Sequence, residues 1–185
     1  MATEFETQVL EIDPKAIAEK LRSLGAKEVP ETLQKRFVFD LECLNSVNPG
    51  MGRWIRLRQI GDKTTLTYKN KSGTGISDTQ EIEMEVSDFD KMQEILSKLD
   101  CFTGKYYQEN KRTRFVLEDI EFNIDQWPLI PPFLEIEATS LKNVEHGLQL
   151  LGLQEKENAH WGLINIYSKY GIDLHSYKEI KFQES

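Results

Sequence analysis

Short segments in which charged residues alternate with apolar ones recur along the chain, and each segment carries charges of one sign. Acidic alternations occur at residues 4–6, 81–85 and 135–137, and basic ones at residues 56–58, 69–71 and 112–114. In an extended strand, residues i and i+2 lie on the same face, so each segment would place its charges on one side. The pattern predicts a sheet with one strongly polar face, suited to a polyanion and its metal ions.

The length and composition are those of one globular domain that spans residues 1–185. The chain is 39% hydrophobic and 29% charged, with a net charge of −8. The negative charge disfavours nucleic acids and anionic membranes as partners. No apolar run has the length of a membrane span, and the N-terminus does not resemble a signal peptide, so we expect a cytoplasmic protein. The sequence leaves open whether it is a monomer or a homodimer.

Three strand–helix units are visible in the hydrophobic periodicity. Strands at residues 4–11, 80–86 and 133–139 each precede a helix, with Asp13, Ser87 or Asp88, and Ser140 as the expected N-caps. Further strands are expected at residues 33–41, 52–60, 63–71, 106–117 and 120–127, and a last helix at residues 158–170. After that helix the polar end of the chain is expected on the surface.

Tight turns at Gly61-Asp62 and Glu118-Asp119 make the strands that they join antiparallel. Eight strands are close to the number that closes a barrel around one small ligand, and the helices can cover its outside. The predicted fold is therefore α+β, an eight-stranded, mainly antiparallel β-barrel with a polar interior and helices packed outside. The apolar residues expected to meet those helices are Phe5, Ile55, Leu57, Leu66, Tyr68, Ile82, Met84 and Ile136.

The charged neighbours would then point inward. A dry interior could not hold so many ions, because removing each one from water costs several kcal/mol. The interior must be hydrated, and divalent metals with a phosphate chain would offset charges of both signs. The alternative is that the alternating charges form the solvated face of an antiparallel sheet.

The order of these motifs resembles the CYTH superfamily, which includes class IV adenylate cyclases, thiamine triphosphatases and inorganic tripolyphosphatases, also called triphosphate tunnel metalloenzymes. The resemblance spans nearly the whole chain and is carried by Glu4 and Glu6, Arg56 and Arg58, Lys69, Arg112 and Arg114, Asp125, and Glu135 with Glu137. One position departs from the pattern, because the Glu-x-Glu-x-Lys strand of the family ends here in Gln8. An amide can donate hydrogen bonds but carries no charge.

The resemblance implies a role for each matching residue. Phosphate would be bound by Arg56, Arg58, Lys69, Arg112 and Arg114, and Mg²⁺ or Mn²⁺ by Glu4, Glu6, Asp125, Glu135 and Glu137. Glu4, Glu6, Arg56 and Arg58 would act directly in catalysis. Further candidates are Glu81, Glu83 and Glu85 as an extension of the acidic set, Lys35 or Lys71 as replacements for the missing cation, Gln8 itself, and Lys169 as a residue near the tunnel mouth.

Three functions are consistent with this predicted site. The first is metal-dependent hydrolysis of inorganic tripolyphosphate, thiamine triphosphate or a nucleoside triphosphate, and the second is formation of cyclic AMP and pyrophosphate from ATP. The third is binding of a triphosphate or polyphosphate without catalysis, which the loss of a cation at Gln8 makes reasonable. Hydrolysis is favoured because it requires only an oriented water molecule.

Overall fold

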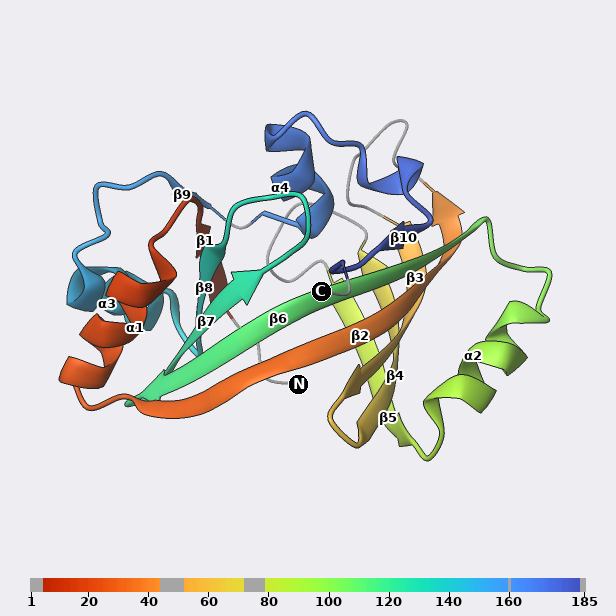
Figure 1. Cartoon of the computed structure of the whole chain (residues 1–185), viewed down its shortest axis with the longest axis horizontal. Helices are drawn as coiled ribbons and strands as arrows, with labels where there is room; N and C mark the ends of the chain where they lie inside the picture. The colour runs from red at the N-terminus through yellow and green to blue at the C-terminus, as the bar shows by residue number, and fades with distance from the viewer. Residues whose placement is uncertain (1–4, 44–51, 72–78, 160, 184–185) are drawn as a thin grey trace. The chain divides into compact units, whose positions relative to one another are not determined.

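A computed structural model describes residues 5–43, 52–71, 79–159 and 161–183. The chain divides into two compact units, each made of two separate stretches of sequence. Unit 1 contains Met1–Thr32 and Lys111–Trp161, and unit 2 contains Leu33–Asn110 and Gly162–Ser185. Two long strands, β2 (Lys27–Cys43) and β6 (Gly104–Leu117), have residues in both units (Figure 1).

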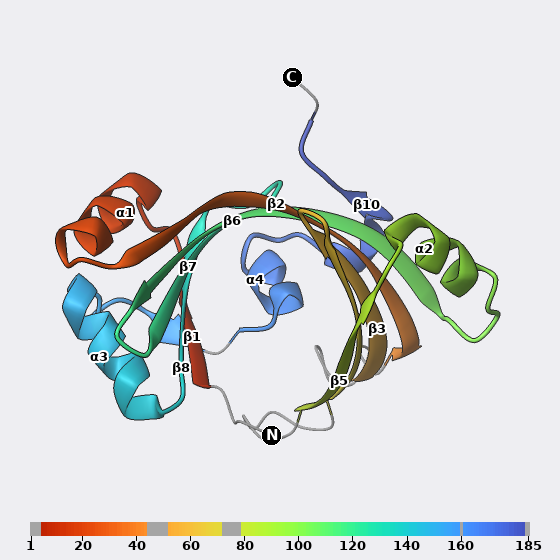
Figure 2. The same cartoon turned by 90° about the horizontal axis from the view of Figure 1, so that it is seen from below.

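Unit 1 is an antiparallel sheet covered on one face by two helices. Its strands are β1 (Phe5–Val9), β7 (Ile120–Gln126), β8 (Phe133–Ala138) and β9 (Asn158–Ala159), in the order β6-β7-β8-β1-β9. Figure 2 shows α1 (Pro14–Ser23) and α3 (Leu141–Leu151) on the same side of these strands. The core between helices and sheet includes Leu21, Phe122, Leu134, Ile136 and Leu148.

Local sequence explains how these two helices begin and how closely one of them packs. The Asp13 carboxylate accepts hydrogen bonds from the backbone N–H groups of Lys15 and Ala16, and the Ser140 hydroxyl accepts one from the N–H of Asn143. Gly147 lets α3 lie close to the sheet, because a Cβ atom there would be 2.8 Å from Cγ2 of Ile136. The apolar residues of the alternating strands are thus covered by helices in unit 1.

Unit 2 is a second antiparallel arrangement, with strands in the order β5-β4-β3-β2-β6. It contains β3 (Gly52–Ile60), β4 (Lys63–Lys71) and β5 (Thr79–Val86), and β10 (Glu179–Ile180) pairs in parallel with β6. Its helices are α2 (Phe89–Ser97), α4 (Leu163–Lys169) and the short 3₁₀ helix η2 (Leu174–Ser176). Phe39, Leu57 and Leu96 form the buried core, so α2 covers the apolar face of β2 and β3.

The predicted α+β class with mainly antiparallel strands is confirmed, and all eight predicted strands are present. Among the described residues, β5 pairs only with β4, and β9 pairs only with β1, so these pairs do not close the sheet into a barrel. The single domain of residues 1–185 stays a prediction. No described helix is long and apolar enough to cross a membrane.

Three expectations were wrong. Ile82 and Met84 do not meet a helix, because their exposed fractions are 71% and 59%. The stretch expected as one helix over residues 158–170 begins instead with the strand β9, and its helix starts at Leu163. The end of the chain is not wholly on the surface, since Leu174 and Ile180 are buried.

Candidate functional site

The polar face of unit 1 gathers carboxylates from two neighbouring strands. In the antiparallel register of β1 and β8, Glu6 lies opposite Glu137, and Gln8 lies opposite Glu135. One carboxylate oxygen from each of Glu6, Glu135 and Glu137 can be chosen so that all three lie within 4.8 Å of one another. We call these three residues the acidic cluster. Glu4, which was predicted beside them, lies outside the described residues.

Arg112 is a cation that contacts two carboxylates of this face. Its Nε donates to Oδ1 of Asp125 at 2.9 Å and its Nη2 donates to Oδ2 at 2.5 Å, while Nη2 also donates to Oε1 of Glu135 at 3.0 Å. Asp125 is fully buried. Burial alone would lower the pKa of Arg112, but the carboxylates of Glu135 and Asp125 raise it overall. The guanidinium therefore stays charged and holds two carboxylates in fixed positions.

The carboxyl group of Glu135 has an altered acidity. Burial raises its pKa above the usual 4.5, Arg112 acts in the opposite direction, and the nearby charge of Glu6 raises it further. Carboxylates that crowd together in this way are those that a divalent cation stabilises, because the ion offsets their repulsion.

Gln8, which replaces the lysine of the family pattern, is buried and has two hydrogen-bond partners. Its Nε2 donates to Oε2 of Glu135 at 3.2 Å, and its Oε1 accepts from the backbone N–H of Trp161 at 2.7 Å. The amide therefore orients a carboxylate of the acidic cluster and ties β1 to the chain that follows β9. The contact to Trp161 could not be found from the sequence, because 153 positions separate the two residues.

The other predicted cation of unit 1, Arg114, is exposed, and its Nη2 lies 2.6 Å from Oε2 of Glu121. Asn123 lies between Arg114 and Glu135 in the strand registers and is fully buried. Its Nδ2 donates to Oε1 of Glu121. Sequence reasoning missed Asn123, although it shares the alternation of Glu121 and Asp125.

The polar face of unit 2 carries three of the five predicted phosphate-binding cations. Arg56 and Arg58 each place Nη2 3.8–3.9 Å from Oε2 of Glu83, and Nζ of Lys69 forms an ion pair with Glu81. A hydrogen bond from Oγ1 of Thr67 at 2.7 Å is the main cause of the lowered pKa of Glu83, and Arg58 and Arg56 lower it further.

The three glutamates of β5 therefore have a different environment from the one expected. Glu81 and Glu83 contact cations of unit 2, and Glu85 forms an ion pair with Lys63 at 2.5 Å. None of the three belongs to the acidic cluster, which among the described residues consists of Glu6, Glu135 and Glu137. Their expected role as further metal ligands stays a prediction.

The three additional lysine candidates differ in where they lie. Lys35 is exposed and shares the face of Phe37 and Phe39, away from Arg58, so its expected role as a replacement cation does not fit. Arg36, one residue further on, lies opposite Arg58. Lys71 shares the face of Lys69 two residues along β4, and Lys169 is exposed in the last turn of α4.

The amino-acid sequence is similar to those of known proteins. The model of the CYTH domain family matches residues 49–158, more than half of the chain. A protein from Methanocaldococcus jannaschii, named as a candidate adenylate cyclase, is 30% identical over 140 residues, which cover 74% of this chain and 77% of that protein. The chain belongs to the CYTH domain family.

Solved structures show the same CYTH fold. A Pyrococcus horikoshii protein superposes with a TM-score of 0.67 at 24% identity, covering 88% of this chain and 99% of its own. A Hippeastrum protein, described as a candidate adenylyl cyclase with a dominant triphosphatase activity, has a TM-score of 0.58 at 16% identity and covers 90% of this chain and 95% of its own. The matched residues 49–158 include all the motif positions from Arg56 to Glu137.

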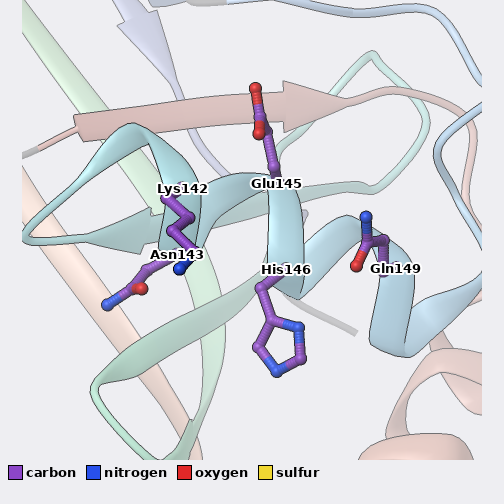
Figure 3. A pocket seen from close by; sticks show the side chains of 5 residues that line it. All are labelled: Lys142, Asn143, Glu145, His146 and Gln149. Carbon is purple, nitrogen blue, oxygen red and sulfur yellow. The ribbon is translucent and has the colours of Figure 1, made fainter.

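Outside these motif positions of the CYTH domain, a hollow of about 410 Å³ lies on α3. Its lining consists of Lys142, Asn143, Glu145, His146 and Gln149 (Figure 3). All five side chains come from one helix of unit 1, and none was predicted as a site residue. His146 lies 3.8 Å from Glu118 and contacts no member of the acidic cluster among the interactions described for it. We assign this hollow no function.

Proposed function

We propose that this CYTH protein binds a triphosphate together with Mg²⁺ or Mn²⁺ and hydrolyses its terminal phosphoanhydride bond. The observation that carries the proposal is the acidic cluster of Glu6, Glu135 and Glu137, with Arg112 bonded to one of its members. Carboxylates repel phosphate unless a metal ion lies between them, whereas a site made of cations alone would bind phosphate without a metal. The protein has both kinds of group on polar strand faces.

The acidic cluster suits a small divalent ion in its chemistry and its dimensions. Mg²⁺ prefers oxygen ligands at about 2.0–2.1 Å, so two of its ligands are at most about 4.2 Å apart. Oxygens within 4.8 Å of one another need to move little to reach that arrangement. A bound ion would polarise the phosphoryl group and offset its charge.

The residues of the protein would do the rest of the work. Glu6, Glu135 and Glu137 would hold the ion, and Arg112 would keep Glu135 in place. Arg56, Arg58 and Lys69 would bind non-bridging oxygens of the phosphate chain, for which the arginine fork is well shaped. These three cations form ion pairs with Glu81 and Glu83, so phosphate would take over contacts that already exist.

A second candidate function is cyclisation of ATP to cyclic AMP and pyrophosphate. The observation that favours it is the Methanocaldococcus jannaschii relative, which is named as a candidate adenylate cyclase. The same groups would hold the triphosphate, and the nucleophile would be the ribose 3′-hydroxyl in place of water. Hydrolysis remains our first choice because it needs no site for the nucleobase.

A third candidate is binding without turnover. It is motivated by Gln8, which donates a hydrogen bond where the family pattern has a charged lysine. Binding requires complementary charge, whereas phosphoryl transfer also requires stabilisation of the charge that develops during the reaction.

One assay separates the three functions. The full chain is incubated with inorganic tripolyphosphate, thiamine triphosphate or ATP and with Mg²⁺ or Mn²⁺, and both orthophosphate and cyclic AMP are measured. We expect metal-dependent release of orthophosphate without cyclic AMP. Cyclic AMP from ATP would favour the second function, and ligand binding by calorimetry without either product would favour the third.

A matched pair of substitutions tests the site itself. Glu137→Gln removes a charge from the acidic cluster, and Glu145→Gln makes the same change on the exposed surface of α3. Loss of a group that holds the metal should lower activity by about 10- to 100-fold or more, whereas Glu145→Gln should retain wild-type activity. Equal activity of the two variants would contradict the proposed metal site.

A further inference from the structure

Arg36 is a buried cation that the motif pattern does not include. In the register of β2 and β3 it lies directly opposite Arg58, and on the next strand Arg58 lies opposite Thr65. Residues opposite one another in an antiparallel pair share a face, so Arg36 belongs to the polar face of unit 2. Its exposed fraction is only 9%.

Two arginines in directly opposite positions are unfavourable for an isolated sheet. Like charges across a strand pair repel each other and destabilise it. Arg36 and Arg58 occupy such a pair on the face that also carries Arg56 and Lys69. An anion bound at this face would offset the repulsion.

The side chain of Arg36 is also held in one position by neutral groups. Its Nη2 donates to Oε1 of Gln34 at 3.2 Å and to Oδ1 of Asn110. Gln34 and Asn110 are themselves buried, with exposed fractions of 5% and 1%. Amide oxygens carry no net charge, so these two hydrogen bonds orient the guanidinium on the polar face without neutralising it.

Arg36 lies beside groups that are shielded from water, which strengthens its electrostatic interactions. Tyr167 of α4 is fully buried, and burial raises the pKa of its hydroxyl, while the positive charge of Arg36 lowers it. This coupling means that Arg36 acts electrostatically on a neighbour that is shielded from water. A charge in such a low-dielectric setting interacts with a ligand more strongly than an exposed one.

We propose that Arg36 is a fourth phosphate-binding side chain of unit 2, beside Arg56, Arg58 and Lys69. Its ligand would be a phosphate group of the triphosphate, and the inference therefore rests on the proposed function. Arg36 contributes to affinity for the phosphate chain, whereas Gln34 and Asn110 are positioning residues that fix the guanidinium. Lysine would be a poor substitute, because it lacks the planar fork.

Calorimetric binding of inorganic tripolyphosphate to the full chain tests the proposal. Arg36→Gln removes the charge, and Lys98→Gln removes the same charge at the exposed C-cap of α2. We expect the Kd of Arg36→Gln to rise at least about tenfold, which corresponds to about 1.4 kcal/mol. Lys98→Gln should stay within about twofold of the wild-type protein, because an exposed charge is largely screened by salt.

A second variant avoids the risk that loss of Arg36 unfolds the protein. Asn110→Asp is nearly isosteric and places a carboxylate against Nη2 of Arg36, so the charge is cancelled while the side chain remains. Asn143→Asp adds the same charge on α3 in unit 1. Tripolyphosphate should bind Asn110→Asp at least about fivefold more weakly than Asn143→Asp, since a neutralised arginine no longer attracts an anion.

The outcomes are distinguishable. If the wild-type protein does not bind tripolyphosphate, the proposed function fails and Arg36 is not the reason. If the wild-type protein binds and Arg36→Gln, folded by circular dichroism, binds as tightly as Lys98→Gln, the role of Arg36 is refuted. Equal affinities of Asn110→Asp and Asn143→Asp would refute it independently.

Discussion

Replacement of Arg112 by methionine should destabilise the protein far more than loss of a surface arginine. Arg112 makes a two-bond contact with Asp125, whose side chain is 1% exposed, and a further bond with Glu135. Methionine keeps much of the volume but leaves the Asp125 carboxylate in a buried position without its cation. Breaking a buried pair in this way costs about 3–5 kcal/mol.

Urea unfolding followed by circular dichroism measures this loss, and thermal unfolding gives an independent value. For a chain of this size, each kcal/mol lowers Tm by about 2–4 °C, so the expected drop is about 6–20 °C. Arg22→Met is the matched control, because Arg22 makes the same two-bond contact with Glu28 at 2.7 Å in an exposed setting. That variant should lose much less stability, since an exposed pair is solvated and screened by salt.

A double variant decides whether the cause is the uncompensated charge. Arg112→Met combined with Asp125→Leu removes both partners, and replacement of a buried pair by apolar groups is often close to neutral. We therefore expect the double variant to be more stable than Arg112→Met alone. The reasoning is refuted if Arg112→Met costs less than about 1 kcal/mol, or if the double variant is no more stable than the single one.

Three further predictions concern other parts of the fold. Gln8→Lys should raise metal-dependent phosphate release by restoring a cation, and should lower stability by about 1–3 kcal/mol because the backbone N–H of Trp161 loses its acceptor. Unchanged activity would show that the missing lysine does not limit the reaction. The contact with Asp40 raises the pKa of His175 above 6.5, so its contribution to the free energy of unfolding is full below pH 6.5 and disappears as the pH rises through the pKa of the folded state. Unfolding at a series of pH values should show that His175→Gln loses more stability at low pH than at high pH, and a loss independent of pH would contradict this. Gly147→Ala gains about 1 kcal/mol from helix propensity, but the new Cβ would clash with the sheet and cost about 1–3 kcal/mol, so Tm should fall. An increase in Tm would mean that α3 can shift away from the sheet.

The strands and their faces could be predicted because alternation with a period of two leaves little freedom. Once residues 133–138 form a strand, Glu135 and Glu137 must share a face, and Ile136 must lie on the other one. The same rule explains the error at Lys35. A shift of one residue moves a side chain to the opposite face, so Arg36 belongs on the polar face and Lys35 does not.

The sequence could not reveal contacts between distant segments, nor which strand residues are covered by helices. The hydrogen bond from the Trp161 backbone to Gln8 depends on where β9 pairs, and a two-residue strand leaves no periodic signal. Ile82 and Met84 have the correct alternation for a covered face, yet they are exposed, because covering depends on the reach of α2 rather than on the strand itself.

Unit 1 is divided in the sequence by residues 33–110, and this affects when a new chain can assemble the acidic cluster. During synthesis Glu6 emerges before Glu135 and Glu137, which complete the cluster more than 100 residues later. At about 5–20 residues per second, the ribosome needs roughly 6–26 s to pass from the first of these glutamates to the other two. Until then β1 lacks its partner strand β8, and the three carboxylates of the acidic cluster cannot come together. A divalent ion bound to the cluster as proposed would therefore favour native structure only late in translation, after the intervening strands have been made.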